Sequence, residues 1–220
     1  MRSFGFCGAE LIALGSGALL WPEQSLLVVS DLHLGKSERI ARRSGQMLPP
    51  YENTETLTRL EADIDAHAPS NVLCLGDSFD DLNAGHALSD PVTEWLTRLM
   101  AGRVWTWIEG NHDPGPLELG GTHLAQQSVG ALTFRHIADL DACTGEVSGH
   151  YHPKASLHSR GRTVTRPCFL YDNTRLILPA YGTYTGGLRS SSAQLQTLMQ
   201  PDARAILTGA STVEIPMPRV

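Results

Sequence analysis

The sequence predicts an α/β fold built on a parallel sheet. Three short apolar runs, SLLVVSD (residues 25–31), NVLCLGD (residues 71–77) and RVWTWIEGN (residues 103–111), each end abruptly in polar residues or glycine. Near-continuous apolar runs of this length are typical of strands that are covered on both faces. Helical patterns separate the three runs, and an alternation of strand and helix favours a parallel sheet.

Two helices are expected between these strands. The first follows Asn53 and stops before Pro69. The second has terminal signals, with Asp90 as a plausible N-cap, Pro91 at the first helical position and Gly102 just past the end. The apolar positions with helical spacing are Leu57, Leu60 and Ile64 in the first helix and Val92, Trp95, Leu96 and Leu99 in the second.

The character of the chain changes after Gly121. The runs ALTFRH, GEVSGH, TVTRPCFLYD and RLILPAYG predict short strands separated by turns. A weak helical pattern returns at residues 192–199. A chain of 220 residues with no linker and no internal repeat is expected to form one domain, residues 1–220.

Composition excludes some classes of protein. The net charge of −6 argues against a protein that coats nucleic acid through a broad basic face. No run of about 18 apolar residues is present, so no membrane span is expected. The four cysteines are scattered without a CxxC pair, and we expect a protein of the reducing cytoplasm.

Side chains with metal-binding or acid–base chemistry follow the predicted strands. In open α/β sheets, ligands bind outside the carboxyl ends of the strands. Residues two apart in a strand share a face, so Asp31 with His33, and His150 with His152, are expected to point the same way if the chain stays extended. The residues at these strand ends are Asp31, His33, Asp77, Asp80, Asn111, His112, Asp113, His136, His150 and His152.

The order Asp-x-His, Gly-Asp-x-x-Asp, Gly-Asn-His-Asp, His, Gly-His-x-His, over residues 31–152, resembles the signature of the calcineurin-like binuclear metallophosphoesterases. The resemblance implies two mixed β sheets packed face to face and flanked by helices. Further stretches, among them ARRSGQMLPPYENTETLTRL, SGHYHPKA and LILPAYGTYTGG, resemble the bacterial ligase-associated DNA damage response endonucleases. This branch implies a phosphodiesterase of DNA repair that cuts single-stranded DNA and is associated functionally with a DNA ligase, an exonuclease and a helicase.

The resemblance also implies a site with two divalent metal ions. Two such ions roughly 3.5–4 Å apart make hydroxide available and neutralise the charge of a phosphodiester transition state. Mixed imidazole, carboxylate and amide ligands suit Mn²⁺, Fe or Zn²⁺ better than Mg²⁺ or Ca²⁺, and the DNA-repair branch points to Mn²⁺. Asp77 would bridge the ions. The other ligands would be Asp31, His33 and His152 on the first ion and Asn111, His136 and His150 on the second.

The residues beside Asn111 are interpreted as catalytic. Histidine titrates near working pH, so His112 is predicted to be the general acid that protonates the departing oxygen. Asp113 is predicted to orient the His112 ring, and Asp80 to support the site without binding metal.

The basic stretch GKSERIARRSGQ is the predicted contact with the substrate. Arg39, with Arg42 or Arg43, would share a helix face and contact DNA phosphates beyond the reacting one. Tyr181 and Tyr184 could stack on unpaired bases. Two alternatives stay open at this point: a small-molecule or nucleotide-lipid phosphoesterase of the same superfamily, and a non-catalytic scaffold.

Overall fold

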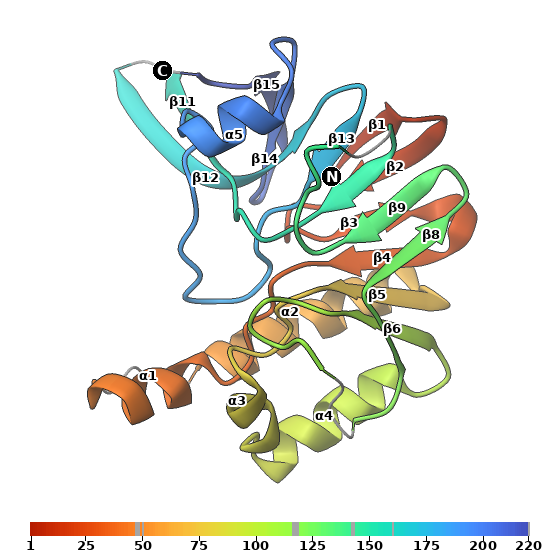
Figure 1. Ribbon diagram of the computed structural model, residues 1–220, viewed down its shortest axis with the longest axis vertical. Coiled ribbons are helices and arrows are strands. Elements are labelled where there is room, and N and C mark those ends of the chain that lie inside the picture. Colours follow the sequence, from red (N-terminus) through yellow and green to blue (C-terminus); the bar gives the residue numbers. More distant parts are fainter. Residues whose placement is uncertain (47–48, 50, 116–118, 142–143, 160, 220) are drawn as a thin grey trace.

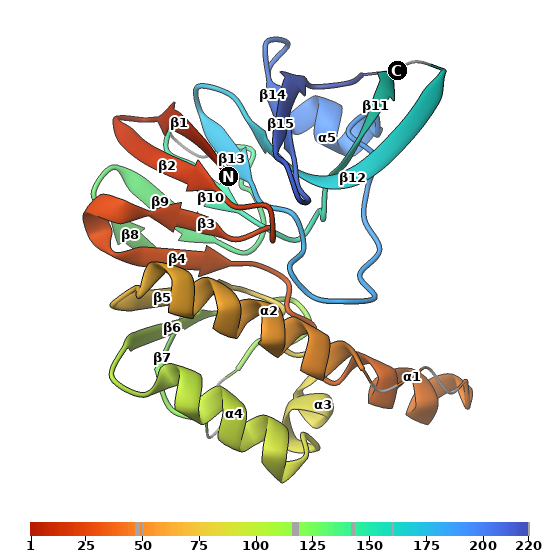
Figure 2. The same ribbon diagram turned by 180° about the vertical axis from the view of Figure 1, so that it is seen from behind.

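Two mixed β sheets form the centre of the structure, a computed structural model (Figures 1 and 2). It describes residues 1–46, 49, 51–115, 119–141, 144–159 and 161–219. The seven-stranded sheet follows chain order, antiparallel from β1 to β4 and parallel from β4 to β7. Its strands are β1 (Arg2–Phe6), β2 (Ala9–Ala13), β3 (Leu19–Trp21), β4 (Leu26–Val29), β5 (Asn71–Leu75), β6 (Val104–Ile108) and β7 (Thr122–Leu124).

The second sheet has the order β15-β14-β12-β13-β10-β9-β8, and β11 pairs with β12 beside this path. The pairs β10–β9 and β10–β13 are parallel, and the other pairs formed by its described strands are antiparallel. Its strands are β8 (Gln126–Val129), β9 (Leu132–Arg135), β10 (Glu146–Ser148), β11 (Lys154–Ser159), β12 (Arg162–Tyr171), β13 (Arg175–Ile177), β14 (Arg204–Leu207) and β15 (Val213–Pro216).

Helices cover the outer faces of both sheets (Figure 2). Leu57 of α2 and Leu96 of α4 pack with Leu27 and Cys74 on the outer face of the first sheet. Leu195 of α5 packs against the second sheet. The helices are α1 (Lys36–Ser44), α2 (Glu52–His67), α3 (Leu82–His86), α4 (Asp90–Met100) and α5 (Ala193–Leu198), with a short 3-10 turn η1 (Pro22–Gln24).

The core between the sheets explains the apolar runs of the sequence. Val28 and Leu73 point toward the second sheet and pack with Phe134 and Phe169, whereas Leu27 and Val29 point toward the helices. Because both faces of β4 are buried, its side chains are apolar without alternation. The predicted α/β fold with two mixed sheets is confirmed.

Small differences from the prediction concern helix ends. The helix α4 includes Asp90, and the residue before it is Ser89, so Asp90 is not the N-cap. The helix α2 begins at Glu52, so Asn53 lies inside it, and its side chain accepts a hydrogen bond from the Gly35 amide (2.8 Å). Among the described residues, no helix is long and apolar enough to cross a membrane.

The segments that follow β4 and β5 stay paired beyond the regular sheet. The amides of Asp31, His33 and Leu34 donate to the carbonyls of residues 76, 77 and 78 at 3.1, 2.9 and 2.9 Å. In return the amide of Asp80 donates to the carbonyl of Leu34 at 3.0 Å. These bonds bring the polar residues after the two strands into register.

Candidate metal centre

The backbone reverses hand at the predicted ligands. Asp31, His33 and Asp77 have φ angles of 54°, 47° and 46°, and His150 and His152 have 70° and 45°. Non-glycine residues rarely adopt this left-handed region, and such strain concentrates at functional sites. The expectation that each pair points the same way from an extended chain is therefore wrong: His150 and His152 face different groups.

The first group consists of Asp31, His33 and His152, whose ligand atoms lie within 4.8 Å of one another. Asp31 Oδ1, His33 Nε2 and His152 Nε2 are buried and have no hydrogen-bond partner in the described part of the chain. A buried polar atom without a partner costs about 1–3 kcal/mol. Three such atoms converging on one point fit a cation, which would satisfy all of them at once.

The second group consists of Asp77, His136 and His150. The His136 ring donates from Nδ1 to the Leu75 carbonyl (3.1 Å), so its Nε2 offers a lone pair. That Nε2 lies 3.3 Å from Asp77 Oδ2, 3.0 Å from Asn111 Oδ1 and 3.3 Å from His150 Nδ1. Four atoms able to bind a cation thus face one another, and this group also fits a metal ion.

The titration of the second group balances charge within it. Burial lowers the pKa of His136, but the carboxylates of Asp77 and Asp31 outweigh it and raise that pKa to about 8. Burial raises the pKa of Asp77, but the His136 ring and the His112 amide lower it to about 2. A proton on His136 therefore balances Asp77 near neutral pH, and a bound cation would displace it.

The two groups adjoin one another. His136 Nδ1 lies 4.0 Å from Asp31 Oδ1, and the amide of His150 donates to Asp31 Oδ2 at 3.0 Å. The structure groups Asp77 with the second set of ligands. Its role as a bridge to the first ion stays a prediction.

Asp80 supports the first group from behind. Its Oδ1 accepts from His33 Nδ1 at 2.8 Å, which turns Nε2 of that ring toward the other ligands. Its Oδ2 pairs with Arg39, and Lys36 Nζ lies 3.5 Å from Oδ1. Burial raises the pKa of Asp80, but His33, Lys36 and Arg39 lower it to about 2. The carboxylate is therefore charged and held from two sides.

His112 lies at the edge of both groups. Its amide donates to Asp77 Oδ1 at 2.8 Å, and its Nδ1 donates to the Asp80 carbonyl at 2.9 Å. Its Nε2 is consequently turned toward the site, 4.0 Å from Asp77 Oδ2. The side chain is 34% exposed, so a substrate can reach it.

Asp113 does not orient the His112 ring, and that prediction needs correction. Its Oδ1 accepts from the Gly110 amide (3.0 Å), and its Oδ2 accepts from the amides of Ser78 (2.7 Å) and Phe79 (3.1 Å). The residue ties the loop after β6 to the loop after β5. The contact was mispredicted because adjacency in sequence does not show which way a buried carboxylate turns.

The arginines of α1 pair with carboxylates. Arg42 Nη2 lies 3.0 Å and Arg43 Nη2 3.7 Å from the Asp81 carboxylate, with side chains 40% and 68% exposed. Arg39 is only 19% exposed and is held by Asp80. Asp81, expected to be plain surface, also accepts from the Ala84 amide (2.6 Å) as the N-cap of α3.

The two tyrosines predicted to stack on bases differ. Tyr181 is fully buried, donates to Asp63 Oδ2 at 2.9 Å and lies under the Arg59 guanidinium, so it belongs to the core. Tyr184 is 42% exposed. It lies two residues after Gly182, whose amide donates to the Asp31 carbonyl at 3.0 Å. Of the two rings, that of Tyr184 remains available to a base.

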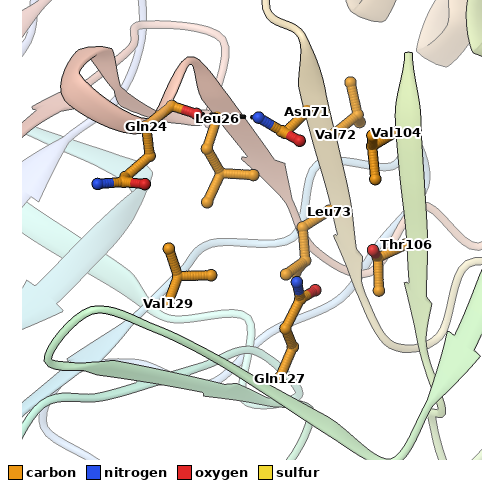
Figure 3. Close-up of a pocket in the computed structure, with 9 residues that line it drawn as sticks. All are labelled: Gln24, Leu26, Asn71, Val72, Leu73, Val104, Thr106, Gln127 and Val129. Carbon is orange, nitrogen blue, oxygen red and sulfur yellow. Dashed lines mark hydrogen bonds between the residues drawn. The ribbon is translucent and has the colours of Figure 1, made fainter.

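Two cavities lie near the strands. One of about 360 Å³ borders the second group and is lined by Asn111 and His136 together with Arg135 and Glu109. Figure 3 shows the other, of about 210 Å³, at the amino ends of β4, β5 and β6, where Asn71 donates to the Gln24 carbonyl at 3.0 Å. The described residues that line this second cavity include no titratable side chain, so the acid–base and metal chemistry belongs to the carboxyl ends.

Glycine is required beside the second group. Gly76 has a φ of +76°, and a Cβ there would lie 2.3 Å from His136 Nδ1 and 2.4 Å from its Cγ. Gly45 has a similar φ of +68°, but a Cβ on it would meet no described atom within 4 Å. Close approach of the His136 ring, in addition to backbone conformation, therefore excludes a side chain at Gly76.

Comparison with known proteins agrees with this geometry. The calcineurin-like phosphoesterase family matches residues 25–149. Among solved structures, nuclease MPE of Pseudomonas putida is 25% identical, with a TM-score of 0.78 over 97% of this chain and 99% of that one. A phosphoesterase of E. coli, Yfce, is 14% identical with a TM-score of 0.43, over 88% of this chain and 99% of its own. No protein in the curated set matches significantly.

Gly76→Ala should weaken metal binding at the second group. The methyl group would push the His136 ring from its place, while the first group lies apart from it. Gly45→Ala is the matched control, because it carries the same left-handed strain of about 1–2 kcal/mol without the clash. Metal analysis after dialysis should find fewer ions per chain only in Gly76→Ala. Full metal content in that variant would contradict the assignment of His136.

Proposed function

The chain belongs to the calcineurin-like phosphoesterase family, and from this membership we propose that it hydrolyses DNA phosphodiester bonds, as a single-strand endonuclease of DNA repair. The observation that carries the proposal is the convergence of two Asp–His groups, each fit for a divalent cation, beside an accessible histidine. The structural similarity to a protein named as a nuclease supports a nucleic-acid substrate.

We propose that two divalent cations, Mn²⁺ in the first instance with Fe or Zn²⁺ as alternatives, occupy the site. Asp31, His33 and His152 would hold one ion, Asn111, His136 and His150 the other, and Asp77 both. Such a pair supplies Lewis acidity and makes hydroxide available near neutral pH. The protein's own part is to place these donors, and the left-handed backbone at five of them does so.

His112 is proposed as the general acid. Since its Nδ1 hydrogen is bound to the Asp80 carbonyl, the transferable proton is on Nε2, which faces the site. That proton would pass to the oxygen of the departing strand as the phosphorus–oxygen bond breaks. Asp113 holds the loop carrying Asn111 and His112 in place through backbone amides, so its contribution is indirect.

A single strand is favoured by the exposed ring of Tyr184. Stacking on an aromatic side chain needs an unpaired base, and this tyrosine, with a φ of 61°, lies on the loop bonded to Asp31. We further propose that residues 1–220 act as one domain in the cytoplasm, functionally associated with a DNA ligase, an exonuclease and a helicase. A small-molecule or nucleotide-lipid substrate, and a non-catalytic scaffold, are the competing functions.

One experiment separates these functions. The Mn²⁺-loaded protein is incubated with single-stranded DNA, duplex DNA and an aryl phosphodiester. We expect single strands to be cut faster than duplex, with internal products on a gel. Hydrolysis of the aryl diester without cleavage of DNA would favour a small-molecule enzyme. Two bound ions with no hydrolysis of any substrate would favour a scaffold.

His112→Ala should lower the rate of DNA cleavage by about 10²–10⁴-fold, the usual contribution of general acid–base catalysis. An aryl ester with a good leaving group needs little protonation, so its hydrolysis should fall less. The amide that donates to Asp77 is retained in the variant, so metal content should not change. Equal losses on both substrates, measured as kcat, would instead assign His112 to charge stabilisation.

The arginines of α1 should separate into two classes. Arg42→Ala with Arg43→Ala should flatten the salt dependence of DNA binding by roughly 0.7 per lost phosphate contact on a single strand, because both side chains are exposed. Arg39→Ala should instead weaken metal binding, because Arg39 acts through Asp80 and His33. A salt slope unaltered by the double substitution would assign Arg42 and Arg43 to pairing with Asp81 alone.

A further inference from the structure

Charge is distributed very unevenly along the chain. Residues 147–201 contain six basic residues and a single acidic one, Asp172. The whole chain has 17 basic and 23 acidic residues, so the remainder has 11 and 22. A positive segment in a protein of net charge −6 is typical of a local contact with an anionic partner.

The β11–β12 hairpin carries much of this segment and extends past the neighbouring strands (Figure 1). Lys154, Ser156 and His158 alternate along β11 and share one face with the cross-strand partners Thr163 and Thr165. The buried Ala155 lies on the opposite face and packs in the core beneath α5. The polar face is therefore fixed in orientation.

A groove of about 180 Å³ runs along this polar face, and Arg189 and Ser190 form its other wall. No carboxylate is among the described residues that line it. The hydroxyls pair with neutral partners, Ser156 with Thr165 and His158 with Thr163, both at 2.8 Å. In the described part of the chain, Lys154 and Arg189 make no ion pair.

The groove begins beside the first group of ligands. Lys154 is two residues from His152, and its ammonium donates to the Thr185 carbonyl at 3.5 Å. A Cβ on Gly187 would lie 2.1 Å from the His152 carbonyl and 3.1 Å from Lys154 Cε, so this loop touches both residues. From Lys154 to His158 the strand spans about 13 Å, which exceeds the distance of about 3.4 Å between successive phosphates along a B-form strand.

We propose that this groove binds the backbone of a nucleic-acid strand on one side of the cleaved bond, with Lys154 and Arg189 contacting phosphates and the hydroxyls of Ser156 and Thr165 between them. The proposal rests on the proposed function and adds the path of the substrate. The carboxylate-free lining of described residues fits a polyanion, and continuity with His152 places that polyanion next to the metal ions. A phosphodiester chain meets both conditions.

The test compares salt dependence of kcat/KM for single-stranded DNA in the metal-loaded enzyme. Replacing Lys154 and Arg189 by Ala removes two contacts, so the slope should flatten by about 1.4. Over a fourfold rise in salt, the variant should lose about sevenfold less activity than the wild type. Arg162→Ala is the matched control, since Arg162 is exposed and alternates onto the other face of β12. Ser156→Lys, which adds a charge in the groove, should steepen the slope.

A second measurement locates the contacts on the substrate. Single methylphosphonate linkages, which lack the phosphate charge, are placed at successive positions on either side of the cleaved bond. The wild type should lose activity for neutral linkages on one side, and the variant without Lys154 and Arg189 should lose nothing further there. Equal sensitivity of both enzymes, or an equal change in slope for Arg162→Ala, would overturn the groove assignment alone. Absence of DNA cleavage by the wild type would overturn the proposed function and the groove together.

Discussion

The paired segments that follow β4 and β5 determine where the reactive side chains lie. Four backbone hydrogen bonds join residues 31–34 to residues 76–80 after the regular sheet has ended. They hold Asp31 and His33 of one segment against Asp77 and Asp80 of the other. Asp113 adds a third segment, because its two oxygens accept amides from both the β5 and β6 loops. The ligands are thus positioned by backbone bonds, before any ion is bound.

That arrangement forces charge and lone pairs together in a place with little water. Asp31, Asp77 and Asp80 are all at most 2% exposed, and buried carboxylates need compensation. Asp80 obtains it from Arg39, Lys36 and His33, whereas the cationic partners of Asp31 and Asp77 in the described part of the chain are all histidines. This difference separates the supporting carboxylate from the predicted ligands. Divalent cations would stabilise the latter, and so the free energy of metal binding also becomes free energy of folding.

Sequence reasoning was sufficient for the strand order of the site but not for its local geometry. The buried runs predicted β4, β5 and β6, and the polar residues at their ends indicated where ligands gather. The hand of the backbone at Asp31 or His152 could not be predicted, because left-handed φ at non-glycine residues follows from tertiary contacts that outweigh local preference. The same is true of the long-range partners of Asp113 and Arg39, which are 34 to 41 residues away in sequence. For Tyr181, composition alone cannot distinguish a buried ring from an exposed one.

The uneven charge of the chain gives the net value of −6 a different meaning. A uniform negative surface would repel a polyanion everywhere, but here the negative charge belongs to the part outside residues 147–201. Repulsion by that part and attraction by the hairpin would act in the same direction, turning an approaching strand toward β11. Such steering is screened by salt within about 8–10 Å at physiological ionic strength. It therefore affects the association rate and orientation of a strand, while the chemistry at its phosphate depends on the ions and His112.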